Sequence, residues 1–543
     1  MTITPESLDA VAAGLPLFVA IPMLLGGILV MVGNRLRIHA MVLTAYQALS
    51  LVASVVMIYA FTDNGGAIAH AVGPWPTGIA IPFAADMFTA LMLTFTSILL
   101  LVCTWFSYAS YAANSMFFAP LVLVLTTGVN GALLTADLFN LFVFLEVMLL
   151  PSYGLFVLSA NRKTPLRRVD GARLYVTVNL FTSTVFLAGV GFLYGTAGTV
   201  NLALLAEAAQ HDDTVAMAGA ICLFALGIKA SVVPMHGWLA RSYPSTSPAI
   251  TALFSGLHTK VAIYGIYRIY SIVFGGDTRF LWVGVVLFSL SMVIGVLGAV
   301  GEKTTRSILA FHMVSQLGYI LLGVALFTEL GLTAGIFYLI HHMVVKAALF
   351  LSTGAVEVRY GTGTIGDLGG VARAEPVIAV AFFIAALSMA GIPPFSGFAA
   401  KLMLVLAAVE RGEILAVVCM ILVSLITLVS MMKIWAGMFW EKKNDDELPD
   451  VMPSRFTPET AGSSARGAAP LTQTLTQSHT ETAVHAEETP RRRINASLAA
   501  PAVVLTLVTI TFGLGAQLLF GWAEVAAGGL LDPSAYIEAV IAG

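Results

Sequence analysis

The feature that most constrains this chain is a series of apolar blocks, each close to the 20 residues that an α-helix needs to cross a bilayer. The 543 residues are 58% hydrophobic and only 10% charged, whereas an ordinary soluble domain is about 25% charged. This composition excludes a soluble, water-facing body of this size. The sequence therefore predicts an all-α polytopic membrane protein.

Turn residues and charges between the apolar blocks divide the chain into fourteen predicted spans. The spans lie near residues 12–33, 40–61, 84–110, 117–135, 138–160, 173–197, 213–240, 249–274, 280–300, 307–327, 332–354, 376–409, 413–440 and 496–520. Spans one to three occupy 1–110, and two groups of five spans follow at 111–275 and 276–440. The segment 441–495, rich in Thr, Ser, Ala, Pro and Glu, is predicted to be a disordered cytoplasmic linker. The last span and an external tail make up 496–543.

Lys and Arg residues in the loops are distributed in a way that supports this order of spans. Cytoplasmic loops collect these residues in polytopic membrane proteins. Alternate loops, beginning with Arg35 and Arg37, hold nineteen of them, whereas the opposite loops and both termini hold only Arg279 and Arg411. We therefore expect a multi-pass protein of a prokaryotic cell membrane with both termini outside.

Six cations remain inside the apolar blocks: Lys229, Lys260, Arg268, Lys346, Lys401 and Lys433. A charge near the centre of a membrane helix costs roughly 2.5 to 3.5 kcal/mol, so a purely structural protein would not keep so many of them. Four of the lysines lie deep enough to predict a functional role. Arg268 and Lys433 lie nearer to the ends of their spans, where snorkelling to the headgroups or structural pairing is favoured.

Carboxylates are scarcer than cations inside the predicted spans. Glu146 is the one that lies deep in a span, and Asp137 begins the same span. Nine residues are two and a half helical turns, so these two side chains face opposite ways and do not form an acid–base pair.

Three polar stripes run along apolar helices at helical spacing, namely His258 with Ser255, His312 with Ser315 and Gln316, and His342 with Lys346. A lone histidine inside a membrane can be a hydrogen-bonded core residue, and this alternative stays open for His258 and His341. Stripes aligned with buried lysines are more typical of a wetted proton path, because histidine titrates near neutral pH. The adjacent His341 and His342 point about 100° apart, so no metal site is predicted.

Two spans carry prolines close to a buried lysine. Pro234 follows Lys229 in the seventh span, and Pro393 and Pro394 precede Lys401 in the twelfth. Proline removes a hydrogen bond within the helix, so both helices should be interrupted inside the membrane. Such interruptions mark ion sites in transporters, although a kink that serves packing alone is the alternative at each. Each interrupted helix is fourth in its group of five, which predicts two inverted repeats.

Redox and nucleotide sites are not indicated. Cys103, Cys222 and Cys419 lie in separate apolar blocks and suggest neither a disulfide framework nor an iron–sulfur site. The sequence also lacks a GxxxxGK[ST] loop and a GxGxxG unit between a strand and a helix. We therefore expect no cofactor and no direct use of ATP or NADH.

The motifs around these residues resemble a known family. They are DLFNLFVFLEV with Glu146, GIKASVVPMHGWLARSYPSTSPAITALFSGLHTKVAIYGIYR with Lys229 and Lys260, LAFHMVSQLGY with His312, YLIHHMVVKAALF, and AGIPPFSGFAAKL with Lys401. Over residues 110–440 the chain is similar to the antiporter-like membrane subunits shared by respiratory complex I and Mrp-type multisubunit Na+/H+ antiporters. Lys rather than Glu at position 401 makes it most similar to the MrpD branch of this family.

This resemblance implies a fold, a path and partners. The fold would have fourteen helices in two repeats, and the site would combine a pair of Glu146 and Lys229 with a central polar axis. The expected proton path runs through Glu146, Lys229, His258, Lys260, His312, His341, His342, Lys346 and Lys401. The partners would be other membrane subunits, H+, Na+ or another monovalent cation, and the lipid bilayer, with no nucleic acid.

Two other functional classes remain possible from the sequence. The chain could be the proton-pumping membrane subunit of an NADH- or ferredoxin-dependent dehydrogenase complex, which would use the same path. A self-sufficient transporter is disfavoured, because dedicated Na+ sites need clustered oxygen ligands and deep carboxylates are scarce here.

Overall fold

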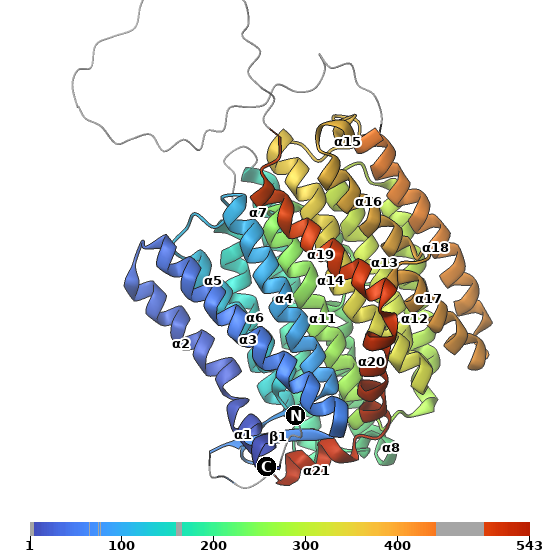
Figure 1. The fold of residues 1–543 in the computed structure, drawn as a ribbon. Helices are drawn as coiled ribbons and strands as arrows, with labels where there is room; N and C mark the ends of the chain where they lie inside the picture. Colours follow the sequence, from blue (N-terminus) through green and yellow to red (C-terminus); the bar gives the residue numbers. More distant parts are fainter. Residues whose placement is uncertain are drawn as a thin grey trace, which may run out of the picture.

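The computed structural model describes residues 5–64, 66–73, 75, 78–158, 165–440 and 493–542. Most of them form long helices that run side by side between the two ends of the molecule, and both termini lie at the same end (Figure 1). The predicted linker at 441–495 lies outside the described residues, apart from its last three.

The long helices follow the order of the predicted spans, and two short strands lie between the second and third of them. The N-terminal region contains α1 (Pro5–Gly14), α2 (Leu17–Val32), α3 (Leu36–Asn64), β1 (Ala67–Val72), β2 (Ile81–Asp86) and α4 (Met87–Ala109). The next group contains α5 (Phe118–Leu134), α6 (Leu138–Leu158), α7 (Pro165–Ala197), α8 (Ala208–His211), α9 (Asp213–Lys229), α10 (Gly237–Ser242), η1 (Tyr243–Ser245) and α11 (Pro248–Ile272).

The second half of the chain also contains long helices and one interrupted helix. It contains η2 (Thr278–Phe280), α12 (Leu281–Gly301), α13 (Thr305–Leu326), α14 (Glu329–Tyr360), α15 (Val371–Ala374), α16 (Pro376–Ala390), α17 (Ser396–Glu410), α18 (Ile414–Ile434) and η3 (Trp435–Trp440). The C-terminal region contains α19 (Ala496–Leu514), α20 (Ala516–Leu531) and α21 (Ser534–Ala542).

Eleven helices in the described part of the chain are long and apolar enough to cross a membrane, or twelve if the bent pair α20 and α21 counts as one span. The eleven account for all the predicted spans except three. Those three correspond to α5, which is shorter, and to the interrupted pairs α9 with α10 and α16 with α17. The protein is therefore an all-α polytopic membrane protein, and the number fourteen stays a prediction.

Both interruptions lie where the prolines are. α9 ends at Lys229, Ser231 has a positive φ of 60°, and helix resumes only after Pro234. α16 ends before Gly391, whose φ is 85°, and helix resumes after Pro393 and Pro394. A left-handed glycine is a common end to a helix, because glycine has no Cβ atom and adopts a positive φ without steric strain.

Two glycines allow α5 and α6 to pack closely. A Cβ atom added to Gly128 would overlap the backbone of Met148, and one added to Gly131 would overlap the ring of Phe144. The two helices therefore approach through surfaces that only glycine permits.

The same pattern recurs between α12 and α13. Here Gly295 lies against the backbone of Ser315, and Gly298 lies against the ring of Phe311. Each of these four residues is separated from its counterpart in α5 and α6 by the same number of positions. This correspondence supports the two predicted repeats.

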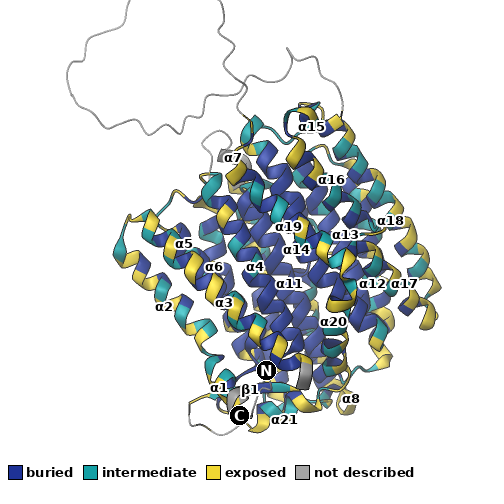
Figure 2. Cartoon of the chain, viewed as in Figure 1, coloured by how far each residue is buried: buried dark blue, intermediate teal, exposed yellow. Residues whose placement is uncertain are grey.

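The most buried helices lie in the middle of the bundle (Figure 2). α11, α13 and α14 are buried along almost their whole length, whereas α2, α7 and α18 expose apolar side chains on the outside. α14 packs against α4, α11, α13, α16, α17, α19 and α20. It is therefore the central helix of the fold.

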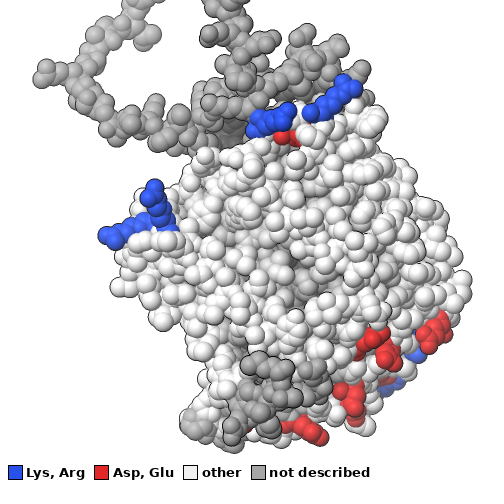
Figure 3. All heavy atoms as spheres, in the orientation of Figure 1, with Lys and Arg blue, Asp and Glu red and all other residues white. Residues whose placement is uncertain are grey.

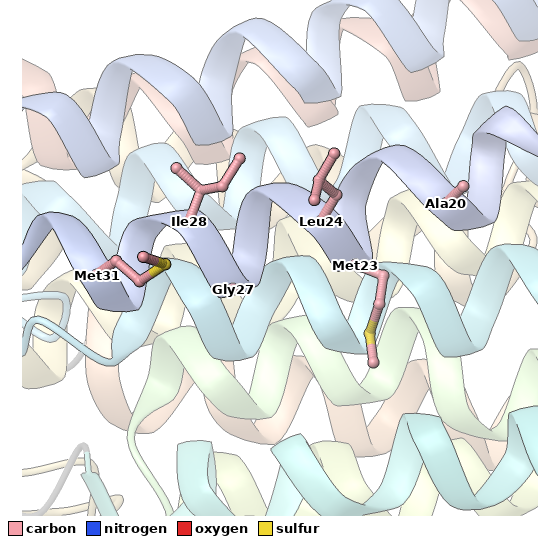
Figure 4. A pocket seen from close by; sticks show the side chains of 6 residues that line it. All are labelled: Ala20, Met23, Leu24, Gly27, Ile28 and Met31. Atoms are coloured by element: carbon pink, nitrogen blue, oxygen red, sulfur yellow. The ribbon is translucent and has the colours of Figure 1, made fainter.

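The outer face of α2 carries a shallow apolar hollow of about 500 Å³ (Figure 4). Its lining consists of Ala20, Met23, Leu24, Gly27, Ile28 and Met31. A surface of this composition suits lipid chains and offers no ligand for an ion.

Two features differ from the sequence prediction, one before α4 and one near the C-terminus. The chain before α4 forms an antiparallel hairpin in which Ala67 pairs with Asp86 and Val72 pairs with Ile81. Helix also continues beyond the end of the predicted last span, because the segment after Gly515 stays rich in Ala, Leu and Val up to Leu531. α20 packs against α14 and α4, so this segment belongs to the bundle.

On the surface of the described residues, charged side chains gather near the two ends of the molecule (Figure 3). On the face shown in Figure 3, most Lys and Arg lie at the end opposite the termini, and most Asp and Glu lie at the end that holds the termini. The wide apolar surface between them fits a bilayer.

Replacing Gly128 with Leu should lower the melting temperature of the purified protein. The added side chain would force α5 and α6 apart, and overpacking of this kind costs about 1 to 3 kcal/mol. The matched control is Gly191→Leu on the exposed face of α7, where an added Cβ meets nothing within 4 Å. An equal loss of thermal stability in both variants would contradict the close packing.

Candidate functional site

Lys229 and Glu146 form the first part of the site, near the interruption after α9. Lys229 is the last residue of α9 and is buried, and its Nζ donates to Asn179 Oδ1 on α7 at 3.4 Å. Glu146 on α6 lies close enough to act on Lys229 electrostatically. Its Oε1 has no hydrogen-bond partner within the described residues, and none of the ion pairs found there joins the two side chains. The two groups are neighbours without direct contact.

His258 connects three helices next to this position. Its Nε2 is 2.9 Å from Ser152 Oγ on α6, and its Nδ1 is 2.9 Å from the hydroxyl of Tyr175 on α7. Lys229 is an electrostatic neighbour of the same imidazole. A histidine with a hydroxyl on both nitrogens can pass a proton from one side to the other by exchanging tautomers.

Lys260 lies two residues further along α11 and is fully buried. Its Nζ donates to the backbone oxygen of Ser255 at 2.5 Å and to Thr259 Oγ1 at 3.2 Å. Both His342 and Lys346 on α14 are electrostatic neighbours of Lys260. The ammonium group therefore faces the central helix.

Lys346 and His342 are the polar groups of the site that have the fewest hydrogen-bond partners. Both are fully buried, and within the described residues neither the Nζ of Lys346 nor either ring nitrogen of His342 has a hydrogen-bond partner. Lys346 lies over the ring of Phe350, 5.5 Å from its centroid. Buried polar groups without a partner among the protein's own atoms are unusual.

Histidines on α13 and α14 continue the series. His312 Nε2 is 2.9 Å from Ser430 Oγ on α18, and His341 Nδ1 is 2.8 Å from Ser396 Oγ at the start of α17. His312 has Lys346 and Lys401 as electrostatic neighbours, so it stands between them.

Lys401 lies at the interruption between α16 and α17. Its Nζ donates at 3.1 Å to the backbone oxygens of Met389 and Ala390 and to Ser424 Oγ. These two carbonyls belong to the last turn of α16, where a helix leaves its C=O groups unpaired and carries a partial negative charge. The ammonium also lies over the ring of Tyr319, 5.0 Å from its centroid. The interruption thus supplies the ligands that hold this lysine.

Together these residues form one buried file across the bundle. The electrostatic neighbours form two runs that meet on α11, where His258 and Lys260 are two residues apart. The first run is Glu146, Lys229 and His258, and the second is Lys260, His342, Lys346, His312, Lys401 and His341. All the residues predicted for the proton path lie along this file. No cluster of three metal-binding side chains occurs in the described ranges.

The secondary candidates lie outside the file or beside it. Ser255 contributes a backbone oxygen to Lys260, and Gln316 Oε1 accepts from the hydroxyl of Tyr338. Ser315 Oγ instead donates to the backbone oxygen of Met292 on α12 at 2.9 Å, so this hydroxyl joins two helices.

Asp137 and Lys433 serve the ends of helices. Asp137 Oδ1 accepts the backbone N–H of Asn140 at 2.7 Å and caps α6. Burial raises the pKa of the Asp137 carboxyl above its usual range, although this hydrogen bond partly offsets the effect. Lys433 Nζ donates to the backbone oxygens of Val300 at 2.9 Å and Glu302 at 2.7 Å, at the end of α12.

Several partners of the file were not found by sequence reasoning. They are Asn179, Ser152, Tyr175, Ser396, Ser424 and Ser430. They come from several different helices, and no spacing in the sequence connects them to the residues that they contact. Only the fold places these groups beside the buried cations.

The model of one protein family matches residues 135–427, which include every residue of this file. The family is described as "NADH:quinone oxidoreductase/Mrp antiporter, TM". The chain belongs to this family.

Curated relatives match almost the whole chain. A protein named as the D subunit of a Na(+)/H(+) antiporter from Alkalihalophilus pseudofirmus is 34% identical over 96% of this chain and 98% of its own length. A protein of the same name from Bacillus subtilis is 32% identical over 96% of this chain and 98% of its own length. These family members confirm the predicted resemblance to the MrpD branch.

Solved structures of the family share the fold. A chain in the structure of the Mrp complex from Dietzia sp. is 52% identical, covers 98% of this chain and 99% of its own, and superposes with a TM-score of 0.88. A chain of the archaeal membrane-bound sulfane sulfur reductase is 23% identical, covers 98% of this chain and 99% of its own, and gives a TM-score of 0.80. A chain of respiratory complex I from Thermus thermophilus is 20% identical, covers 94% of this chain and 98% of its own, and gives a TM-score of 0.67. At these identities the last two matches show the fold alone.

Replacing Asn179 with Leu should slow cation/proton exchange about tenfold, because a hydrogen bond to a charged group contributes roughly 1.5 to 3 kcal/mol. Exchange is measured in everted vesicles that contain the assembled complex. The control is Thr184→Val, since the exposed hydroxyl of Thr184 bonds only to its own helix at Leu180. Unchanged exchange in Asn179→Leu would show that the contact with Lys229 is dispensable.

Proposed function

We propose that this chain is the proton-translocating subunit of a multisubunit Na+/H+ antiporter of the Mrp type. The observation that carries the proposal is the buried file from Glu146 to Lys401, whose two runs meet on α11 and which extends between the two interrupted helices. The names of the curated relatives and the likeness to a chain of the Mrp complex support the antiporter class. The chain would act as a transporter subunit with no chemical step of its own, beside other membrane subunits.

Proton movement along the file would depend on the charges of neighbouring groups. A carboxylate near Lys229 stabilises the charged ammonium, so a change in the position of Glu146 would release a proton from Lys229 toward His258 and Lys260. Lys346 and the histidines around it would then carry the proton to Lys401. Glu146 acts as the gate of the file.

The orientation in the membrane follows from the distribution of charge. The end rich in Lys and Arg would face the cytoplasm, by the positive-inside rule, together with the ends of α18 and the start of α19 (Figure 3). Both termini would then lie outside. The two predicted repeats at 111–275 and 276–440 would each supply half of the file.

A subunit of a redox-driven dehydrogenase is the other class that the shared fold allows. The native partners separate the two classes. Co-purification with small membrane subunits supports the antiporter, whereas co-purification with flavin and iron–sulfur subunits supports the dehydrogenase.

Replacing Glu146 or Lys229 with Ala should lower exchange in everted vesicles by about a hundredfold or more, the usual effect of removing a proton-transfer group. Assembly of the complex, followed by co-purification of its subunits, should persist. The control is Lys303→Ala, which removes an exposed cation between α12 and α13. Undiminished exchange in the Glu146→Ala or the Lys229→Ala variant would overturn the assignment.

A further inference from the structure

A buried ion pair lies outside the proposed path, at the end of the bundle that holds the termini. Asp86 ends β2, and both of its carboxylate oxygens accept from Arg268 on α11: Nη1 to Oδ2 and Nη2 to Oδ1, each at 2.8 Å. Asp86 is only 5% exposed and Arg268 only 2%. Arg268 therefore takes part in a fork-shaped pair and does not reach the lipid headgroups.

This ion pair lies on the same helix face as Lys260. Lys260, Tyr264 and Arg268 follow one another at intervals of four residues on α11, so successive side chains are neighbours. The Tyr264 ring separates the lysine of the file from the ion pair. The stripe extends from the middle of the bundle toward the end that holds the termini.

Hydroxyl groups bridge Tyr264 to the carboxylate. The hydroxyl of Tyr264 is 2.8 Å from Thr89 Oγ1, and Thr89 Oγ1 donates to Asp86 Oδ1 at 3.0 Å. The backbone N–H of Thr89 donates to the same oxygen at 3.0 Å, and Arg268 Nη2 donates to the Tyr264 hydroxyl at 3.1 Å. A continuous hydrogen-bonded chain thus leads from Tyr264 to Asp86.

The C-terminal helices cover this cluster. Tyr536 on α21 lies over the guanidinium of Arg268, with 4.5 Å from Cζ to the ring centroid. Ser271 Oγ donates to the backbone oxygen of Leu530 at 2.5 Å, and a Cβ added to Gly529 would lie 3.9 Å from Asp86 Oδ2. α21 bends away from α20 by 71° and packs against β1 and β2 (Figure 1). α20 and α21 therefore close the route from the ion pair to solvent.

We propose that Asp86, Thr89, Tyr264 and Arg268, here termed the outer cluster, form a second proton outlet that connects Lys260 to the external side, with α21 as its lid. The inference rests on the proposed function and on the proposed orientation. It assigns the outer cluster a role in release that the file from Glu146 to Lys401 does not include.

The closed arrangement explains why protons do not escape at rest. Lys260 Nζ is directed toward Ser255 and away from Tyr264. Both oxygens of Asp86 accept hydrogen bonds from Arg268 or Thr89, and these bonds stabilise the unprotonated carboxylate. The other titratable groups that face Asp86 are Tyr264 on α11 and Tyr536 on α21.

Opening requires Lys260 to turn toward Tyr264 and Asp86 to separate from Arg268. The ammonium then gives one proton to the Tyr264 oxygen while the hydroxyl proton of Tyr264 moves to Thr89 and that of Thr89 moves to Asp86. Both hydroxyls are unchanged after the step, Lys260 is neutral, and Asp86 carries the proton until it passes to water. Displacement of Tyr536 exposes the carboxylate to the outside.

The test uses the double variant Asp86→Asn with Arg268→Gln in the complete complex, assayed in everted vesicles. The amides remove both charges, and Asn keeps the shape of Asp whereas Gln is shorter than Arg. Co-purification of the subunits therefore checks assembly, and a merely structural ion pair predicts normal exchange in an assembled complex. We expect assembly with exchange lowered at least about tenfold, because an amide cannot accept the proton. Normal exchange by the double variant would overturn the proposal.

A matched control and a second measurement make the result specific. The control is Asp277→Asn with Arg279→Gln, which removes an ion pair of 2.7 Å at the same end whose arginine side chain is 47% exposed, and exchange should not change. Thr89→Cys should react with an external, membrane-impermeant thiol reagent at least about tenfold faster when Tyr536 is replaced by Ala, the change expected from removing a lid. Equal labelling rates with and without Tyr536 would exclude α21 as the lid, even if the double variant does not assemble.

Failure of the inference can be distinguished from failure of the proposed function. If the chain does not carry protons, Lys229→Ala has no effect on exchange. If only the outer cluster has been misassigned, Lys229→Ala abolishes exchange while the double variant retains it.

Discussion

Burying amino groups inside an apolar bundle requires oxygen atoms to receive them, and the rest of this fold depends on how that requirement is met. Lys401 is received by carbonyls that the end of α16 leaves unpaired, and Lys260 is received by a backbone oxygen of its own helix. Lys346 on α14 has no such partner within the described residues. The central helix therefore carries a buried lysine that no protein oxygen within the described residues receives.

The sequence predicted the buried cations and the interruptions well for a physical reason. Charges and prolines are rare inside apolar blocks, so Lys229, Lys346 and Pro234 stand out without any knowledge of the fold. Hydroxyl partners such as Ser152 and Ser430 could not be predicted, because serine and threonine are common in membrane helices and their contacts depend on which helices meet. Asp86 was missed because it stands at the edge of an apolar block, where a carboxylate looks like an ordinary loop residue. Its burial results from α20 and α21, whose helical extent was itself underestimated.

The outer cluster and the file differ in how their charges are compensated. In the outer cluster Asp86 and Arg268 neutralise each other with good geometry, which is the condition under which a buried ion pair is tolerated. Along the file the cations outnumber the one carboxylate, Glu146, and hydrogen bonds alone hold most of them. The first arrangement resists change until both partners separate, and the second responds to any change in neighbouring charge. The molecule therefore combines a buried file whose charges respond to their neighbours with an ion pair at one end that stays closed until both partners separate.

The glycine contacts of α5 with α6 and of α12 with α13 have a mechanical consequence. Where two helix backbones approach so closely, sliding or rotation of either helix would cause a steric clash. Each pair therefore behaves as a rigid unit, here termed a bracket. No such contact crosses the gap between α9 and α10, where a Cβ added to Gly227 or Gly237 would meet nothing within 4 Å. Across the other gap, Gly397 on α17 lies against the backbone oxygen of Ser388 on α16. Lys229 lies at the first of these gaps. Movement during a transport cycle would then be concentrated at the gap between α9 and α10, while the two closely packed helix pairs keep their positions. Glu146 lies on one bracket and Lys229 on a moving part, so the separation between them would record the state of the cycle.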